Sequence, residues 1–352
     1  MSDSIVKKLS MLDRFLPVWI FLAMALGLGL GRMWPGIGPA LDRVKVDTVS
    51  LPIAVGLLWM MYPVLAKVRY GELGHLTTRG RLLGLSLAFN WVIGPLLMFG
   101  LAWLFLPDLP HYRTGLILIG LARCIAMVLI WNLLACGSNE LAAVLVALNS
   151  LFQILFYSVL GWLFITVIPG WLGIEGSALH ISMLDIAKSV TIFLGVPLIA
   201  GAMTRFILVR RRGEAWYEKV FLPRLGPTAL VGLLYTIVLM FAMQGDKILA
   251  HPLDVLRIAV PLLVYFAVIF IAAFLLARKL GCTYEETAAV AFTAAGNNFE
   301  LAIAVAVGVF GIASGEALAG VVGPLIEVPA LIALVYLALW LRRRLWPPAT
   351  AV

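Results

Sequence analysis

The chain has 352 residues, of which 63% are hydrophobic and only 12% are charged, and its mean hydropathy is +1.05. Average proteins carry about 25% charged residues, so too few charges are present here to form the polar shell of a soluble domain. The net charge of +8 does not require a nucleic-acid ligand, because the basic residues gather between apolar runs. The composition predicts an integral membrane protein.

The first half of the chain contains five apolar runs that are long enough to cross a hydrocarbon core, which takes about 20 residues. They lie at residues 15–34, 49–67, 82–106, 113–135 and 140–168. The runs are continuous and do not alternate over ten-residue segments, which favours membrane helices over a β-barrel. The basic arm before the first run lacks a small-residue cleavage site, so we predict no cleaved signal peptide.

The second half contains five further runs, at residues 184–209, 226–244, 254–278, 286–311 and 316–341. A polar, basic loop over residues 210–224 is expected to join the halves on the cytoplasmic side. Most Lys and Arg residues lie in the N-terminal arm, the even-numbered loops and the C-terminus, so the positive-inside rule places both termini in the cytoplasm. We predict one membrane transporter domain over residues 1–352.

The two halves resemble each other weakly, with the matches in the same order. Residues 55–58 (VGLL) recur at 231–234, and Pro52 corresponds to Pro227. Because each half has an odd number of spans, the second half enters the membrane from the opposite side. The pattern predicts two inverted five-helix repeats, about 15–168 and 184–341, as in many secondary transporters. Accidental similarity between ten unrelated spans is the alternative.

Polar residues interrupt the middle of the fourth and ninth spans. The ninth span contains Gly296, Asn297 and Asn298, and these align with residues 122–124 of the fourth. Glycine and asparagine tolerate irregular backbone, and broken helices at a repeat interface leave polar groups to hold a substrate near the membrane midplane. We therefore predict an all-α protein whose fourth and ninth helices are broken and cross at the midplane.

Three charged residues lie within predicted spans: Arg123 in the fourth, Glu300 in the ninth and Glu327 in the tenth. Each would cost about 2.5–3.5 kcal/mol on insertion scales if it stood alone at a helix centre. They either face a functional cavity or form an ion pair between Arg123 and one glutamate that locks helices together. Cys124 favours the functional interpretation, because an adjacent guanidinium increases the thiolate fraction of a cysteine.

Other residues give weaker indications. Trp131 lies seven residues after Cys124, which places both on one face of a continuous helix. Cys136 and Cys282 lie at span ends and are expected to be small apolar fillers. The four histidines, which are expected in loops and not in a metal site, are His75, His111, His180 and His251. The motifs of ATPases, zinc proteases and serine hydrolases are missing, so we predict neither an enzyme nor an ATP-driven pump.

The stretches GLARCIAMVLIWN, LVALNSLFQ, FTAAGNNFELAIAVAV and GVVGPLIEVPALIALV resemble the arsenical-resistance family of arsenite efflux permeases, within the bile acid/sodium symporter superfamily. The similarity covers essentially the whole chain. It implies that Cys124 contacts the metalloid and that Glu300 is an essential acid. It also implies supporting roles for Arg123, Trp131, Asn149, Phe292, Asn298 and Glu327. The chain departs from many relatives at Gly296, where they have serine, and from several at Leu133, where they have an acid.

The resemblance implies secondary efflux of arsenite, with antimonite as a second candidate, across the plasma membrane. As(III) is soft and thiophilic, so one thiolate with oxygen or amide partners would bind it reversibly. Glu300 and Glu327 would couple export to protons, with arsenite, protons and the lipid bilayer as the only partners and no cofactor or ATPase subunit. A sodium-coupled symporter in which Arg123 binds an organic anion remains open, as does a structural membrane protein.

Overall fold

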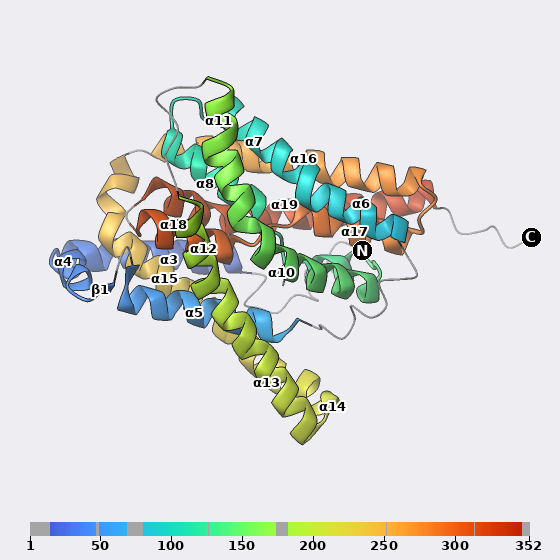
Figure 1. Cartoon of the computed structure of the whole chain (residues 1–352), viewed down its shortest axis with the longest axis horizontal. Helices are drawn as coiled ribbons and strands as arrows, with labels where there is room; N and C mark the ends of the chain where they lie inside the picture. Colours follow the sequence, from blue (N-terminus) through green and yellow to red (C-terminus); the bar gives the residue numbers. More distant parts are fainter. Residues whose placement is uncertain are drawn as a thin grey trace, which may run out of the picture.

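A computed structural model of the chain describes residues 15–46, 49–68, 80–125, 127–173, 182–250, 252–312 and 314–346 (Figure 1). Its regular structure is helical, apart from a two-residue antiparallel pair of strands, β1 (Lys45–Val46) and β2 (Val49–Ser50). Each of the ten apolar runs coincides with helical structure. Among the described residues, six helices are long and apolar enough to cross a membrane: Gly80–Phe105, Asn139–Trp171, Met183–Arg212, Glu214–Met243, Leu253–Lys279 and Gly315–Leu345. Large apolar side chains such as Leu104 (71% exposed) and Phe206 (67% exposed) lie on the surface, as lipid contact requires.

The first two helices of each predicted repeat pack together as a group of four. They are α3 (Leu16–Met33), α5 (Leu51–Ala66), α13 (Val196–Arg212) and α15 (Leu222–Ala250), and α4 (Ile37–Asp42) follows α3. Gly56 of α5 lies against Tyr235 and Thr236 of α15, while Gly232 of α15 lies against the backbone of Met60 in α5. Small residues allow helix backbones to approach closely in a membrane. The repeated VGLL stretches therefore contact each other's helices reciprocally.

A second group of helices surrounds the polar stretches. Its members are α6 (Gly80–Ala88), α7 (Gly94–Phe105), α8 (Pro110–Leu121), α9 (Met127–Leu134), α10 (Asn139–Trp162), α16 (Pro252–Lys279), α17 (Tyr284–Ala295), α18 (Phe299–Phe310) and α19 (Gly315–Leu345). Helix α19 packs against α8, α16 and α18, and α16 packs against α17. Helix α12 (Met183–Val190) contacts both α10 and α18. This group positions the candidate site.

In the described part of the chain, four π-helical turns keep helices continuous where proline would otherwise break them. They are η2 (Phe89–Ile93), η3 (Leu163–Val167), η4 (Thr191–Gly195) and η5 (Tyr217–Phe221), and η3 leads into α11 (Ile168–Trp171). Each ends two residues before a proline: Pro95, Pro169, Pro197 or Pro223. Proline lacks an N–H group and its ring clashes with the carbonyl four residues earlier, and a wider turn relieves both problems.

The prediction of a loop over residues 210–224 is wrong. Helix α13 continues to Arg212, Gly213 reverses the chain with φ +85°, and α14 (Glu214–Trp216) follows directly. Arg, Glu, Ala and Lys are good helix formers, and glycine adopts a positive φ without strain. Arg205 fixes this helical hairpin through ion pairs with Glu214 (3.1 Å) and Glu218 (3.0 Å).

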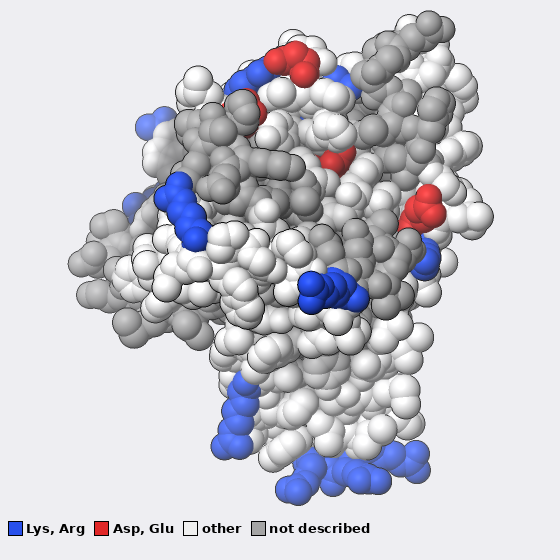
Figure 2. Space-filling view, turned by 90° about the vertical axis from the view of Figure 1, so that its left-hand side faces the viewer, with Lys and Arg blue, Asp and Glu red and all other residues white. Residues whose placement is uncertain are grey.

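The hairpin projects from the lower end of the molecule (Figure 1) and is basic. Arg210, Arg211 and Arg212 are exposed there. Figure 2 shows Lys and Arg side chains gathered at this lower end, with a broad zone of uncharged residues above them. A basic end next to an uncharged zone is the charge distribution that the positive-inside rule associates with the cytoplasmic surface.

Candidate functional site

Two helix interruptions meet at the centre of the second helix group. Helix α8 ends at Leu121 and α9 begins at Met127, while α17 ends at Ala295 and α18 begins at Phe299. The described residues between these helices, 122–125 and 296–298, are where the sequence predicts breaks. Irregular backbone at membrane depth is tolerated where it lies inside protein or lines a cavity.

The interrupted stretches run antiparallel and bond to each other through their backbones. Arg123 pairs with Asn297 as an isolated β-bridge. The N–H of Cys124 donates to the carbonyl of Gly296 (3.2 Å), and the N–H of Asn298 donates to the carbonyl of Ala122 (3.0 Å). Groups that the broken helices leave without intrahelical partners are thereby satisfied in a place that bulk water does not reach.

The two asparagines hold the ends of two helices. The Asn297 amide donates to the carbonyls of Ile119 (2.8 Å) and Ala122 (3.2 Å), at the end of α8. The Asn298 Oδ1 atom accepts from the N–H of Leu301 (3.0 Å) and caps α18. Oδ1 of Asn297 and Nδ2 of Asn298 have no hydrogen-bond partner among the described residues. Each side chain therefore keeps one polar atom for another ligand.

Cys124 occupies a tight position between the two stretches. A Cβ atom at Gly296 would lie 2.8 Å from Cβ and 3.3 Å from Sγ of Cys124, so glycine is what allows this close approach. The Sγ atom of Cys124 accepts from the N–H of Val128 (3.3 Å) at the start of α9. The thiol therefore lies at the N-terminus of α9, next to its backbone N–H groups.

Two carboxylates share a cavity with this thiol. A pocket of 20 Å³ is lined by Cys124, Asn297, Asn298, Glu300 and Glu327, among others. Glu327, in α19, is 4% exposed, and its Oε1 atom accepts from the N–H of Asn297 (3.4 Å). Glu300, in the first turn of α18, is half-buried. The fold thus brings together five residues that are spread over the fourth, ninth and tenth predicted spans.

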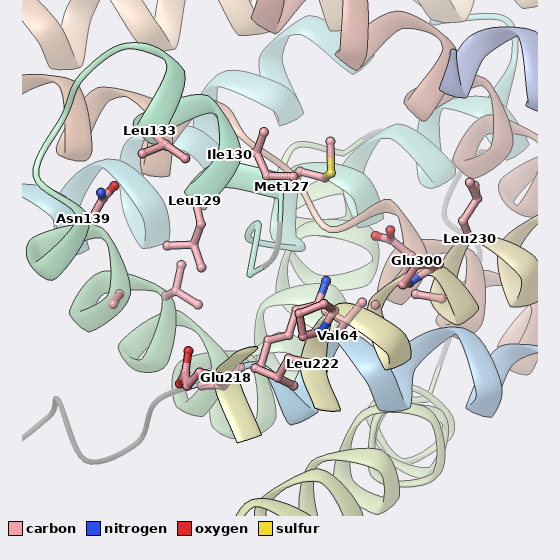
Figure 3. Close-up of a pocket in the computed structure, with 18 of the residues that line it drawn as sticks. Val64, Met127, Leu129, Ile130, Leu133, Asn139, Glu218, Leu222, Leu230 and Glu300 are labelled. Atoms are coloured by element: carbon pink, nitrogen blue, oxygen red, sulfur yellow. The ribbon is translucent and has the colours of Figure 1, made fainter. Parts of the chain in front are cut away.

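A larger cavity of 660 Å³ adjoins the pocket. Both are lined by Val64, Met127, Leu233 and Glu300. Figure 3 shows Glu300 pointing into the larger cavity and Glu218 of η5 at a different part of its wall. The wall is mainly aliphatic and extends to the hairpin end of the molecule. The cavity therefore connects the central pocket with the basic end.

Arg123 points away from both cavities. It is fully buried, and its Nη1 atom donates to the hydroxyl of Tyr265 in α16 (2.8 Å), next to Gly94. Its backbone N–H donates to Oε1 of Gln153 (3.0 Å). Within the described residues Arg123 forms no ion pair with Glu300 or Glu327, so the structure does not support the alternative of a helix-locking ion pair.

Comparison with known proteins identifies the family. Residues 54–251 match the Sodium Bile acid symporter family. The chain is 53% identical to the arsenical-resistance protein Acr3 of Corynebacterium glutamicum, over 97% of the chain and 92% of that protein. It is 32% identical to the Acr3 protein of Alkaliphilus metalliredigens, over 98% and 96%, and 38% identical to an uncharacterised transporter of Synechocystis sp., over 93% and 88%.

The chain belongs to the Acr3 family of arsenical-resistance proteins. Members of this family and of the Sodium Bile acid symporter family are membrane transporters and not enzymes, which agrees with the apolar helices of the structure. The family resemblance stated from the sequence is confirmed.

Besides Arg123, three residues to which the sequence assigns supporting roles line neither cavity. Trp131 is fully buried in α9, and α9 begins only after Cys124, so the prediction that these two residues share one continuous helical face is wrong. Phe292 packs against Phe270, with ring centroids 4.9 Å apart. Asn149 accepts a hydrogen bond from the indole N–H of Trp91 (3.1 Å). Their contacts are those of side chains that support the broken helices.

Tyr265 belongs to the surroundings of the candidate site and is not among the residues predicted from the sequence. It is the one hydroxyl-bearing residue in the apolar eighth run, 254–278, and this isolated polar group is the signal that could have identified it. Its hydroxyl accepts a hydrogen bond from the buried guanidinium of Arg123.

Replacing Tyr265 with phenylalanine should destabilise the protein by about 1–3 kcal/mol, because a buried charged donor would lose its acceptor. The measurement is the change in thermal or denaturant unfolding of the purified protein in detergent. Tyr235→Phe, at a partly exposed position in α15, is the matched control and should leave stability unchanged. Equal stability of Tyr265→Phe and the wild type would contradict the role given to this hydroxyl.

Proposed function

We propose that the protein exports arsenite, As(III), from the cytoplasm across the plasma membrane by proton antiport. One observation carries this proposal: the thiol of Cys124 shares a central pocket with the carboxylates of Glu300 and Glu327, next to a cavity that reaches the basic end of the molecule. The similar proteins from C. glutamicum and A. metalliredigens carry the name arsenical-resistance protein, and this supports the choice of substrate.

The metalloid would bind by exchange of one hydroxyl. Near neutral pH arsenite is mainly uncharged As(OH)₃, and its reaction with the Cys124 thiol gives Cys–S–As(OH)₂ and one water. A single bond between arsenic and sulfur is selective for a soft ion and can still be reversed, whereas three thiolates would retain the metalloid. Because a pocket of 20 Å³ holds about one water, As(III) would lie where the pocket opens into the larger cavity.

The carboxylates would supply the coupling to protons. Glu300 lines both cavities and lies at the helix interruption, so it can exchange protons with water in the larger cavity. Glu327 accepts from the N–H of Asn297. The side chain of Asn297 in turn donates to the carbonyl of Ile119 at the end of α8, shortly before Cys124. Occupancy of the thiol and protonation of the carboxylates can therefore influence each other through directly bonded neighbours, which is the coupling that antiport requires.

We further propose one domain over residues 1–352, with ten membrane crossings in two inverted repeats and both termini in the cytoplasm. Two observations support the repeats. Gly56 and Gly232 make reciprocal contacts between α5 and α15, as equivalent elements do around a two-fold axis. The two interrupted helices pair with each other at Arg123 and Asn297, which would lie near the membrane midplane.

This topology predicts which labels reach which face. With Cys136 and Cys282 replaced by serine and Cys124 retained, Lys219→Cys and Arg343→Cys should react with a membrane-impermeant maleimide in everted vesicles but not in intact cells. Trp171→Cys, at the last residue of α11, lies on the predicted outer face and should show the opposite pattern. Labelling of Lys219→Cys from outside only would refute both the orientation and the inverted repeats.

The function is tested by uptake of As(III) into everted vesicles. We expect uptake that depends on a proton gradient, is unaffected by sodium and is reduced by antimonite if that metalloid shares the site. A sodium-coupled organic-anion symporter predicts sodium dependence instead. Arg123, which would bind the anion in that case, lines neither cavity, and this observation favours the metalloid.

A further inference from the structure

Helix α19 contains a second buried acid, Glu316, in its first turn. Glu316 is 1% exposed, and its Oε1 atom lies 2.9 Å from Nδ1 of His111, whose side chain is 62% exposed. Oε2 of Glu316 has no hydrogen-bond partner among the described residues. Ser314 caps α19 by accepting a hydrogen bond from the N–H of Ala317, so Glu316 is not the capping residue. The carboxylate is thus buried beneath an accessible imidazole and has no capping role.

His111 itself corrects the expectation that all four histidines lie in loops. It lies in the first turn of α8, and the other three histidines fall outside the described residues. The predicted topology places this end of α8 and α19 on the outer face, opposite the hairpin of α13 and α14.

Glu316 lies on the same face of α19 as Glu327. The positions Glu316, Gly320, Gly323 and Glu327 follow the i, i+4, i+7, i+11 spacing of one helical face, and the two acids are about 16 Å apart along the axis. Between them, a Cβ atom at Gly320 would lie 2.7 Å from the side chain of Ile303, and Gly323 contacts the ring of Phe299. Side chains of α18 therefore fill the space between the outer and the inner acid.

His111 is the titratable group that contacts Glu316. On α8, Tyr112 lies against Gly315, and Arg113 turns away to stack over Trp103 (3.7 Å). Helix α18 has one titratable residue, Glu300, at its far end, and Arg257 of α16 pairs with Asp108. The exposed imidazole is therefore the titratable group that acts on the Glu316 carboxylate by direct contact.

We propose that His111 and Glu316 form the outer proton-exchange site of the transporter. An external proton binds to the exposed imidazole of His111 and passes to the Glu316 carboxylate, which leaves the imidazole neutral. When α18 shifts so that Phe299 and Ile303 leave the glycine face, water enters the space between the two acids. A chain of water molecules then carries the proton from Glu316 to Glu327, and Glu316 becomes ionised again. This inference rests on the proposed proton antiport and names the group through which protons enter.

The test separates net proton movement from exchange of As(III). In everted vesicles the lumen corresponds to the outside, so uptake is measured against luminal pH at a fixed external pH. Glu316→Gln should lower proton-driven uptake at least about tenfold. Exchange of labelled for unlabelled As(III) at equal pH, which requires no net proton transfer, should stay at the wild-type rate. His111→Gln, a change at an exposed position that preserves the fold, should alter the dependence on luminal pH.

Asp108→Asn is the matched control, because Asp108 is an exposed acid near the same end of α8 and should change neither rate. Wild-type proton-driven uptake in both His111→Gln and Glu316→Gln would overturn the proposal, and so would equal loss of exchange and driven uptake, which indicates a structural role. Absence of proton-driven uptake in the wild type would instead refute the proposed antiport itself.

Discussion

Replacing Cys124 with serine should abolish As(III) transport while the protein still folds. Serine has nearly the same size and can still accept from the N–H of Val128, but its hard oxygen is a poor ligand for soft As(III). Loss of an outer-shell partner alone typically costs 10–100-fold in metal affinity, so loss of the ligand should reduce transport at least about 100-fold. The measurement is As(III) uptake, with thermal unfolding as the check on the fold.

The other two cysteines are internal controls for this prediction. Cys136 is exposed in the turn after α9, and Cys282 lies in the turn between α16 and α17. Burial raises the pKa of the Cys282 thiol, and the nearby Glu286 carboxylate raises it further, so this thiol stays protonated near neutral pH. Cys136→Ser and Cys282→Ser should therefore transport As(III) normally. Normal transport by Cys124→Ser would contradict the proposed binding of the metalloid to this thiol.

The sequence predicts the position of the helix interruptions because their signal is local. Glycine and asparagine are unusual within an apolar run and indicate irregular backbone there. Gly296 and Asn297 indeed lie in the stretch between α17 and α18. The interpretation of residues 210–224 as a loop fails for the opposite reason. Polarity alone suggested a loop, whereas the strong helix propensity of these residues decides the local structure.

The direction of a side chain is harder to predict from sequence than the position of a helix interruption. Arg123 lies in the predicted interruption, but its guanidinium points to Tyr265, because the antiparallel pairing with Asn297 sets the backbone direction at this residue. Trp131 illustrates the same limit, since its spacing from Cys124 has meaning only along an unbroken helix. The shape of the two cavities depends on packing between helices that are far apart in the chain, and no local pattern carries that information.

Glu316 is the first residue of the predicted tenth run, 316–341, and an exposed acid is ordinary at the end of a span. Its burial depends on His111, which is 205 residues away in the sequence. A contact of this kind is visible only once α8 and α19 are packed together. The acids that matter most for a proton pathway can therefore lie outside the motifs that identify the family.

Replacing Glu300 with glutamine should abolish proton-driven As(III) transport and leave As(III) binding at Cys124 intact. Glutamine has the shape of glutamate but does not ionise near neutral pH, so the half-buried position in the first turn of α18 would keep its packing and lose its proton. The measurements are proton-driven uptake and As(III) binding by the purified protein. Glu140→Gln, an exposed acid in the first turn of α10, is the matched control and should transport normally.

The double variant Glu300→Gln with Arg123→Gln decides between proton coupling and a structural ion pair. If the two residues were only partners in an ion pair, removing both charges would restore transport, as the coupling energy of a double-mutant cycle would show. The Arg123 guanidinium donates to the hydroxyl of Tyr265, whereas Glu300 lines the cavities, so the two charges have separate surroundings. We therefore expect the double variant to remain inactive and to be less stable than the single one. Recovery of proton-driven transport in the double variant would defeat the coupling role of Glu300.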